Sequence, residues 1–315
     1  MIQLRAAPTL CTTAAMLHDN PNAFLGNPLN RVGIERRDPA WIRAQEDHPG
    51  AEMIVFAEGR PLIVRGDASS TLCWLTLDAR SLLPTGTELI LLGHDGEQPR
   101  FAVDVTGREE AFSDFGQFAP LRDAAPYLPP AEAAIAGQAN WLLGWHQRHR
   151  FCARDGGETV MADGGLKRVN PATGAEHFPR TDPVAIVLPT HGDEVCLGRG
   201  PHFPPGFFSA FAGYVEPCET LEECAVREVK EEAGLDIVKL DYIFSQPWPF
   251  PSSLMVGFIG EVSGRELTLD PDEIEEARWF SKDEVRQVLS GEPGDFFTPP
   301  PIAIAHQLLK VWLDR

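Results

Sequence analysis

One stretch of the chain, Gly213 to Leu235 (GYVEPCETLEECAVREVKEEAGL), constrains the fold more than any other. Thr220 followed by Glu223 matches a capping box, in which two side chains satisfy the free N–H groups at a helix start. Gly234 suits the left-handed residue that commonly ends a helix. The spacing therefore predicts a helix that begins after Thr220 and stops at Gly234.

At about 100° per residue, this predicted helix has an apolar face and an acidic face. We expect the apolar face to be buried, and it comprises Ala225, Val226, Val229 and Ala233. The acidic face carries Glu228, Glu231 and Glu232. Like charges four residues apart, such as Glu228 and Glu232, cost about 0.2–0.5 kcal/mol in an isolated helix. A hard divalent cation would turn this repulsion into coordination, since Mg²⁺ prefers oxygen ligands. The alternative is a solvated acidic face.

The spacing favours the metal site, because every defined position of a known pattern is matched. The pattern is G-x5-E-x7-R-E-U-x-E-E-x-G-U, where U is aliphatic, and its positions are Gly213, Glu219, Arg227, Glu228, Val229, Glu231, Glu232, Gly234 and Leu235. This is the Nudix box, so the chain resembles a Nudix hydrolase. The resemblance implies cleavage of nucleoside diphosphates linked to another moiety, with Mg²⁺ or Mn²⁺ as cofactor.

A second motif, SQPWPFPSS at Ser245–Ser253, narrows the resemblance. Its three prolines remove backbone donors and fix φ, so we expect a stiff extended loop rather than a helix or a central strand. Alone, such a loop is also typical of structural packing or of a proline-rich ligand. All nine positions match the SQPWPFPxS array of the NADH pyrophosphatases. The resemblance implies substrate contacts from Gln246, Pro247, Trp248, Pro249, Phe250, Pro251, Ser252 and Ser253.

The resemblance also implies roles for the box residues. Glu228 and Glu232 are expected metal ligands, and Glu231 is either a third ligand or the general base. Glu219 either completes the cluster or hydrogen-bonds a metal-bound water. Arg227 is expected to orient the carboxylates through a bidentate pair.

Further expected site residues lie outside the box. Glu276 matches a position that supplies a distal carboxylate to metal, with a plain surface charge in the acidic run 270–276 as the alternative. The backbone carbonyls of Ala212 and Ala305 match metal or substrate contacts. Phe178 matches an aromatic residue that stacks on a nucleobase, with core packing as the alternative, and Trp248 and Phe250 either stack on substrate or pack the loop.

The length of 315 residues favours two domains, because single cores stop growing near 250–300 residues. We expect a mainly β domain over residues 1–128, with no element at Pro21–Arg37. Its predicted strands are Met53–Phe56, Leu62–Val64, Cys73–Leu77, Glu88–Gly93 and Phe101–Val105. A connector at 129–180 holds a helix, Ala131–Arg148, and a degenerate zinc ribbon.

Residues 181–315 are expected to form a Nudix α/β/α sandwich, so the fold class is α+β with an α-β-α sandwich. Its predicted strands are Val184–Leu188, Glu194–Gly198, Ala210–Val215, Tyr242–Phe244, Leu254–Glu261 and Ala277–Phe280. Helices are predicted at Ser281–Leu289, with Ser281 as N-cap, and at Ile302–Leu313.

The connector departs from the family pattern. Where the family has two C-x2-C pairs, this chain has Cys152, Asp155, Asn170 and Thr173. Asparagine and threonine are poor ligands for a closed tetrahedral site, so we expect no structural zinc. Nearby glycines can still make the turns of the ribbon, and hydrogen bonding among Asp155, Asn170 and Thr173 could replace the metal.

Composition limits the partners and the compartment. The formal charge of −19 disfavours non-specific binding to nucleic acid or anionic membranes. The start of the chain has no unbroken apolar segment, so no signal peptide is expected. The sequence contains no apolar run of 18 residues, so no membrane span is expected either. The six cysteines are scattered, which favours free thiols in a reducing cytoplasm. A homodimer is expected from the resemblance.

The predicted function is metal-dependent hydrolysis of NADH or NAD⁺ to AMP and nicotinamide mononucleotide. Removal of the NAD cap from RNA is the same bond cleavage on a larger substrate, and family members do it. Two alternatives stay open: a Nudix pyrophosphatase for another nucleoside diphosphate, such as ADP-ribose, and a non-catalytic nucleotide-sensing module.

Overall fold

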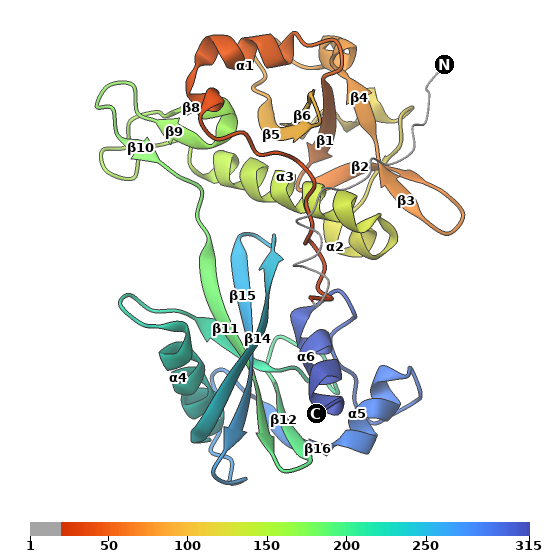
Figure 1. The fold of residues 1–315 in the computed structure, drawn as a ribbon, viewed down its shortest axis with the longest axis vertical. Helices are drawn as coiled ribbons and strands as arrows, with labels where there is room; N and C mark the ends of the chain where they lie inside the picture. The colour runs from red at the N-terminus through yellow and green to blue at the C-terminus, as the bar shows by residue number, and fades with distance from the viewer. Residues whose placement is uncertain (1–19) are drawn as a thin grey trace. The chain divides into compact units, whose positions relative to one another are not determined.

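The computed structural model describes residues 20–315, which form two compact units that meet in sequence at Arg180 and Thr181 (Figure 1). Residues 1–19 lie outside the described part, and they include Cys11 and the start of the chain, where we expect no signal peptide. Within residues 20–315, no helix combines the length and apolarity needed to cross a membrane.

The first unit is built on a mixed sheet with the strand order β3-β2-β1-β6-β5, in which β4 also pairs with β1 and β7 with β2. Its strands are β1 (Glu52–Ala57), β2 (Arg60–Arg65), β3 (Ser70–Leu72), β4 (Trp74–Thr76), β5 (Ile90–Asp95), β6 (Gln98–Asp104) and β7 (Gln117–Phe118). The central strands β1 and β6 run parallel, and Met53 and Val103 pack in the same buried cluster. The expectation of a β-rich first half is confirmed.

The strand predicted at Cys73–Leu77 is wrong in its bounds. Cys73 separates two short strands with different partners, since β3 pairs with β2 and β4 pairs with β1. Leu77 already belongs to a 3-10 turn. The segment is divided because its two halves pair with different strands of the sheet, which local propensity does not specify.

Helices cover this sheet. They are α1 (Pro39–Glu46), α2 (Leu121–Ala124) and α3 (Pro130–Arg148), with 3-10 turns at Glu35–Arg37, Leu77–Leu82, Glu109–Phe112, Ala125–Tyr127 and Asp163–Gly165. The sequence analysis missed α1, although Asp38 caps it by accepting from the Ala40 N–H at 2.8 Å and Pro39 occupies its first turn. The long helix α3 agrees with its prediction within one residue.

The connector forms a small three-stranded sheet after α3. Its order is β10-β9-β8, with β8 at Val160–Ala162, β9 at Lys167–Val169 and β10 at Glu176–His177. The expectation that the ribbon turns persist is therefore confirmed.

The second unit is built on a sheet with the order β14-β15-β11-β12-β16, in which β13 also pairs with β11. Its elements are β11 (Asp182–His191), β12 (Glu194–Arg199), β13 (Phe211–Tyr214), α4 (Leu221–Ala233), β14 (Ile237–Trp248), β15 (Ser253–Val262), β16 (Glu276–Ser281), α5 (Lys282–Leu289) and α6 (Ile304–Leu313). The strands β11 and β15 run parallel, and the other neighbouring pairs are antiparallel.

Alternate residues of β11 face two separate cores. Ala185 and Val187 pack with α4 on one side, in a cluster that includes Ala225 and Val229. Ile186 and Leu188 pack on the other side with residues of α5 and α6. Helices therefore cover both faces of the sheet (Figure 1), and the predicted α/β/α sandwich is confirmed.

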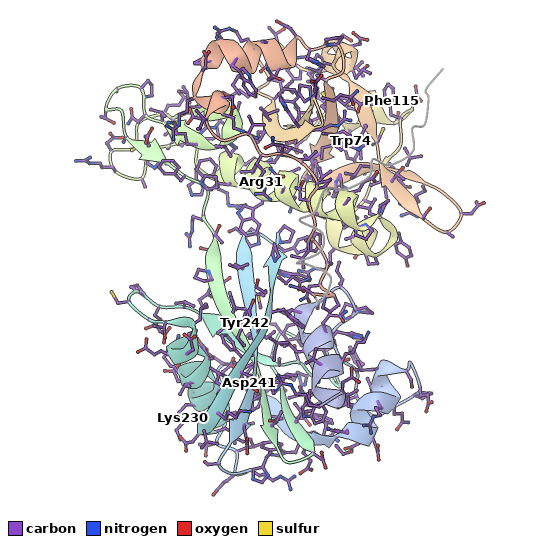
Figure 2. All side chains as sticks on the ribbon, viewed as in Figure 1. Arg31, Trp74, Phe115, Lys230, Asp241 and Tyr242 are labelled. Carbon is purple, nitrogen blue, oxygen red and sulfur yellow. The ribbon has the colours of Figure 1, made fainter. Side chains whose placement is uncertain are left out.

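The SQPWPFPSS motif is not the continuous loop that we expected. Residues 245–248 form the end of β14, where Gln246 pairs with Met255 and Trp248 with Ser253. The motif then turns through a cis Phe250–Pro251 bond and enters β15 at Ser253. Proline is tolerated because β14 is the edge strand, where an N–H can be absent without breaking a ladder on both sides. Tyr242, labelled on this strand in Figure 2, is 60% exposed.

Candidate active site

Helix α4 supports the site, and its ends follow the local signals. The Thr220 hydroxyl accepts from the Glu223 N–H at 3.1 Å, and the Glu223 carboxylate accepts from the Thr220 N–H at 2.8 Å. Gly234 ends the helix at φ 73°. The predicted start and stop are therefore confirmed.

The buried face of α4 differs from the prediction at one position. Ala225, Val229 and Ala233 are fully buried, but Val226 is 42% exposed and Cys224 is buried in its place. The face of α4 that packs on the sheet includes Cys224 and Ala225, and Val226 lies outside this face. The helix is fixed on the sheet by this line, while Lys230 is exposed on the outer side (Figure 2).

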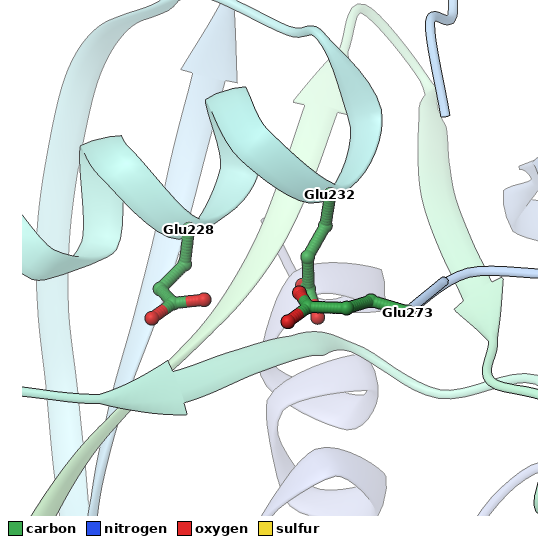
Figure 3. A group of neighbouring side chains, drawn as sticks. All are labelled: Glu228, Glu232 and Glu273. Carbon is green, nitrogen blue, oxygen red and sulfur yellow. The ribbon is translucent and has the colours of Figure 1, made fainter. Parts of the chain in front are cut away.

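Three carboxylates converge beside α4 (Figure 3). Glu228 and Glu232 come from successive turns of the helix, and each is only 8% exposed. Glu273 reaches them from the segment before β16, and one oxygen of each of the three lies within 4.8 Å of the others. Carboxylate oxygens at this spacing are the ligands that Mg²⁺ and Mn²⁺ prefer.

The electrostatics of this cluster fit a cation. Burial, together with the neighbouring Glu228 and Glu273 carboxylates, raises the pKa of Glu232 to about 8. Burial also raises the pKa of Glu228, against the opposing effect of Arg227. One Glu232 oxygen is buried without a hydrogen-bond partner. Buried polar atoms are rarely left unpaired, so a divalent cation would satisfy this oxygen and relieve the repulsion.

Sequence reasoning missed Glu273 as a member of the cluster. It lies in the acidic run 270–276, which offered only the weak signal of several neighbouring carboxylates. The run is brought to the end of α4 by backbone hydrogen bonds, from Thr268 N–H to the Ala233 carbonyl at 3.0 Å and from Asp270 N–H to the Glu232 carbonyl at 3.4 Å. These contacts between distant segments place Glu273 opposite Glu232.

Arg227 links the other box carboxylates. Its Nε and Nη2 atoms donate to the two oxygens of Glu219 at 2.7 and 2.8 Å, in a bidentate pair. Its Nη1 atom donates to Glu228 at 2.6 Å and to Glu231 at 3.0 Å. The guanidinium holds the pKa of Glu219 down at about 2, helped by the Glu216 N–H. Glu219 and Glu231 thus meet Arg227, and the three-carboxylate group does not include them.

The other predicted metal contacts lie as follows. Glu276 opens β16, where it pairs with Arg199 at 3.4 Å and its side chain is 44% exposed. Glu273, three residues earlier, lies beside the helix carboxylates, and the distal metal contact expected of Glu276 stays a prediction. Ala212 lies on β13, and Ala305 is buried in the first turn of α6.

Gln246 of the SQPWPFPSS motif connects two elements of the second unit. Its side chain is fully buried. Its Nε2 atom donates to the Ile302 carbonyl at 2.8 Å, and its Oε1 atom accepts from the Ile304 N–H at 2.8 Å. The amide therefore ties the edge strand to the start of α6, and the substrate contact expected of Gln246 stays a prediction.

The serines of the motif are also internal. Ser252 is 5% exposed and its hydroxyl donates to the Asp182 carboxylate at 2.8 Å. Ser253 is equally buried at the start of β15. The Ser252 hydroxyl thus braces the turn, and the substrate contacts expected of both serines stay predictions.

The aromatic residues of the motif are more accessible. Trp248 and Phe250 are half-buried and pack edge to face, with ring centroids 5.1 Å apart. Among the prolines, Pro251 is exposed, Pro247 is half-buried and Pro249 is buried. Phe178, in the first unit, is 62% exposed, so core packing does not account for it.

Known proteins resemble this chain along most of its length. Family models match three successive segments: an NADH pyrophosphatase-like rudimentary NUDIX domain at residues 50–145, an NADH pyrophosphatase zinc ribbon domain at 147–178, and a NUDIX domain at 179–297. The human NAD-capped RNA hydrolase NUDT12 is 35% identical over 340 residues, which cover 93% of this chain and 73% of that protein.

Two bacterial relatives are similar over comparable shares. The NAD-capped RNA hydrolase NudC of Mycobacterium bovis is 36% identical over 299 residues, covering 90% of this chain and 94% of that protein. The NudC of Chromobacterium violaceum is 40% identical over 222 residues, covering 70% and 79%. The chain therefore belongs to the Nudix family, in the group that joins an NADH pyrophosphatase-like domain and a zinc ribbon domain to the NUDIX domain.

Proposed function

We propose that this protein is a metal-dependent hydrolase that cleaves the diphosphate bond of NADH and NAD⁺ into AMP and nicotinamide mononucleotide. The same cleavage would remove NAD caps from the 5′ ends of RNA. Two observations support the substrate: the SQPWPFPSS motif, and relatives named as NAD-capped RNA hydrolases. The observation that carries the chemistry is the buried pair Glu228 and Glu232, joined by Glu273.

Three carboxylates would hold Mg²⁺ or Mn²⁺, namely those of Glu228, Glu232 and Glu273. Enzymes of the Nudix family use divalent metals. When bound, the cation neutralises charge on the diphosphate and lowers the pKa of a coordinated water. Glu231, Glu276 and the carbonyls of Ala212 and Ala305 remain proposed contributors from the resemblance.

The remaining box residues orient this group and handle the proton. Arg227 fixes Glu219 and Glu228 through charge-assisted hydrogen bonds, which restrict where the Glu228 carboxylate can point. Glu231 is 56% exposed, so solvent reaches its carboxylate. We assign Glu231 the role of general base: it takes the proton from water as the water oxygen attacks phosphorus and the bond to the bridging oxygen breaks.

Aromatic side chains supply surface for the nucleotide. Trp248 and Phe250 present partly exposed rings from the turn between β14 and β15, and the motif prolines stiffen that turn. Rigid aromatic surface binds a flat ring with little loss of conformational entropy. Phe178 is the proposed further stacking residue.

The metal assignment is tested with Glu228→Gln and Glu232→Gln, and with Glu222→Gln as a control at an exposed position of the same helix. Both buried variants should lose NADH turnover by orders of magnitude in Mn²⁺ while circular dichroism stays unchanged. The control should retain its activity. Wild-type activity in both buried variants would overturn the metal site.

The substrate is tested by comparing NADH, NAD⁺, ADP-ribose and NAD-capped RNA at equal concentration. Higher kcat/KM for the NAD compounds is expected. A strong preference for ADP-ribose would show a different Nudix pyrophosphatase. Binding of NAD without turnover in any divalent metal would show a nucleotide-sensing module.

We also propose a homodimer in the cytoplasm. The dimer rests on the resemblance and is tested by light scattering of the purified chain. The compartment is supported by the cysteines of residues 20–315, all of which are free thiols, including the buried Cys152 and Cys196. Free thiols are the rule in reducing compartments.

A further inference from the structure

The connector has the fold of a zinc ribbon but lacks most of the cysteine ligands of that domain. Residues 147–178 match the zinc ribbon domain, and their three-stranded sheet is present. Three of the four positions where the family carries cysteine are Asp155, Asn170 and Thr173. We infer that this ribbon folds without zinc, because a hydrogen-bonded clamp between Asp155 and Asn170 joins its two turns where the metal would be.

The two turns have the same backbone design. In the first, the Cys152 N–H donates to the Gly157 carbonyl at 2.7 Å, and the Gly156 N–H donates to the Cys152 carbonyl at 2.8 Å. In the second, the Asn170 N–H donates to the Ala175 carbonyl at 2.9 Å, and the Gly174 N–H donates to the Asn170 carbonyl at 2.8 Å.

Equivalent glycines, Gly156 and Gly174, adopt left-handed φ values of 74° and 72° in the two turns. Cys152 and Asn170 therefore occupy equivalent places, and so do Asp155 and Thr173. The turns of a two-pair metal site survive in the backbone.

The clamp crosses between these turns. The Asn170 Nδ2 atom lies 3.0 Å from each oxygen of the Asp155 carboxylate. The Gly157 N–H donates to the same carboxylate at 2.8 Å. These donors, led by the Gly157 N–H, hold the pKa of Asp155 below its usual value. The carboxylate thus accepts hydrogen bonds from both turns of the ribbon.

The same bonds leave a poor site for zinc. Among the four positions, only Cys152 offers the sulfur that a structural zinc site prefers. The Asn170 Oδ1 atom accepts from the Ala172 N–H at 2.9 Å, and Asn170 is 1% exposed. An amide and a hydroxyl do not replace sulfur or imidazole nitrogen in a structural site. In the part of the chain that the structure describes, His, Cys, Asp and Glu side chains converge as a metal-binding trio only at Glu228, Glu232 and Glu273.

A second buried network fixes the ribbon to α3. Arg168 of β9 donates to the Thr159 hydroxyl at 2.7 Å and to the Thr159 carbonyl at 2.6 Å. Its Nη1 atom lies 3.1 Å from Nδ1 of His146 on α3, whose Nε2 atom lies 2.9 Å from the Gly165 carbonyl. Arg168, Thr159 and His146 are each at most 9% exposed. The ribbon is thus held by hydrogen bonds within the chain, both to α3 and between its own two turns.

The first experiment measures metal in the purified full-length chain after dialysis against a chelator. We expect well below one zinc per chain. We also expect the same Tm with and without a zinc-selective chelator, measured in excess Mg²⁺ so that the carboxylate site stays supplied. One zinc per chain, or a chelator-dependent fall in Tm, would overturn the inference.

The second experiment tests the clamp itself. Asn170→Ala should lower the Tm by at least about 2–4 °C, the shift that a lost internal interaction causes in a protein of this size. Thr173→Ala is the matched control, because its hydroxyl makes a longer bond of 3.4 Å to the Ala175 N–H at an exposed position. Equal Tm values for the two variants would contradict the clamp.

A third variant restores the four-cysteine set by combining Asp155→Cys, Asn170→Cys and Thr173→Cys with the native Cys152. If the turns hold metal-site geometry, this variant should bind about one zinc per chain, and a zinc-selective chelator should now lower its Tm. Failure to bind added zinc would show that the clamp does not stand in the place of the metal. None of these readouts depends on the NAD reaction.

Discussion

The Glu228 carboxylate occupies the space that a side chain at Gly213 would fill. A Cβ atom placed on Gly213 would overlap all three atoms of the Glu228 carboxyl group. Gly213 belongs to β13, which pairs with β11 beneath α4. The glycine of the Nudix box is therefore required by packing against a carboxylate, and not by an unusual backbone conformation.

Gly213→Ala should displace Glu228 and weaken the metal site without unfolding the domain. Moving one ligand typically costs about 10–100-fold in metal affinity or activity, and we expect a loss of this order in Mn²⁺-dependent NADH turnover. Gly264→Ala is the matched control, since nothing lies within 4 Å of a Cβ at that position. Normal turnover in Gly213→Ala would show that Glu228 is free to move elsewhere.

Glu273 and Glu276 should differ when each is changed to glutamine. Glu273→Gln removes a carboxylate from the three-residue group, so a higher Mn²⁺ concentration should be needed for half-maximal activity. Glu276→Gln removes only a half-exposed ion pair with Arg199, a type of contact worth about 0–1 kcal/mol. A metal titration of both variants checks this order, and the opposite order would make Glu276 the distal ligand.

Gln246→Ala should destabilise the second unit. It leaves the Ile302 carbonyl and the Ile304 N–H without their partner in a buried place, at a cost of about 1–3 kcal/mol for an unsatisfied group. Gln287→Ala is the control, because that exposed amide makes a single bond to the Pro293 carbonyl. Urea unfolding compares the two free energies, and equal stability of both variants would argue against a tie between β14 and α6.

His146 should make the protein less stable in mild acid. Burial, together with the Arg168 and His149 charges, lowers the pKa of His146 from its usual 6.5 to about 4, against the opposing effect of the Gly165 carbonyl. The unfolded chain then binds a proton below pH 6.5 that the folded chain does not bind until about pH 4. Stability from the neutral ring is complete above pH 6.5 and is lost as the pH falls toward 4.

The loss is about 1.4 kcal/mol per pH unit in that window, or roughly 3 kcal/mol in total. His146→Gln keeps an acceptor for Arg168 and a donor for the Gly165 carbonyl but has no titratable ring, so its stability should change less between pH 6.5 and 4. Thermal unfolding across this range measures the slope. The exposed His202→Gln is the control and should keep the wild-type slope; a wild-type slope in His146→Gln would contradict the assignment.

Local signals gave reliable predictions where the physical cause is also local. The capping boxes at Thr220 and Ser281 satisfy N–H groups three residues away, so both helices begin where the sequence indicated. The continuous apolar run Val184–Leu188 likewise indicated a strand, and its residues pack into both cores of the second unit. The prediction that Val226 is buried was wrong because the angle of α4 on the sheet is set by packing, which no helical spacing specifies.

The sequence by itself determined the family, the helix that carries Glu228 and Glu232, and the loss of the zinc ligands, because each depends on residue types at short, fixed spacing. Only the tertiary structure decided that Glu273 joins the carboxylates, that Gln246 braces α6 and that Asn170 clamps Asp155. Those relations join segments 15 to 58 residues apart along the chain. The contacting residues are selected by sheet pairing and by the need to satisfy buried polar groups. Both depend on how distant segments come together in the fold.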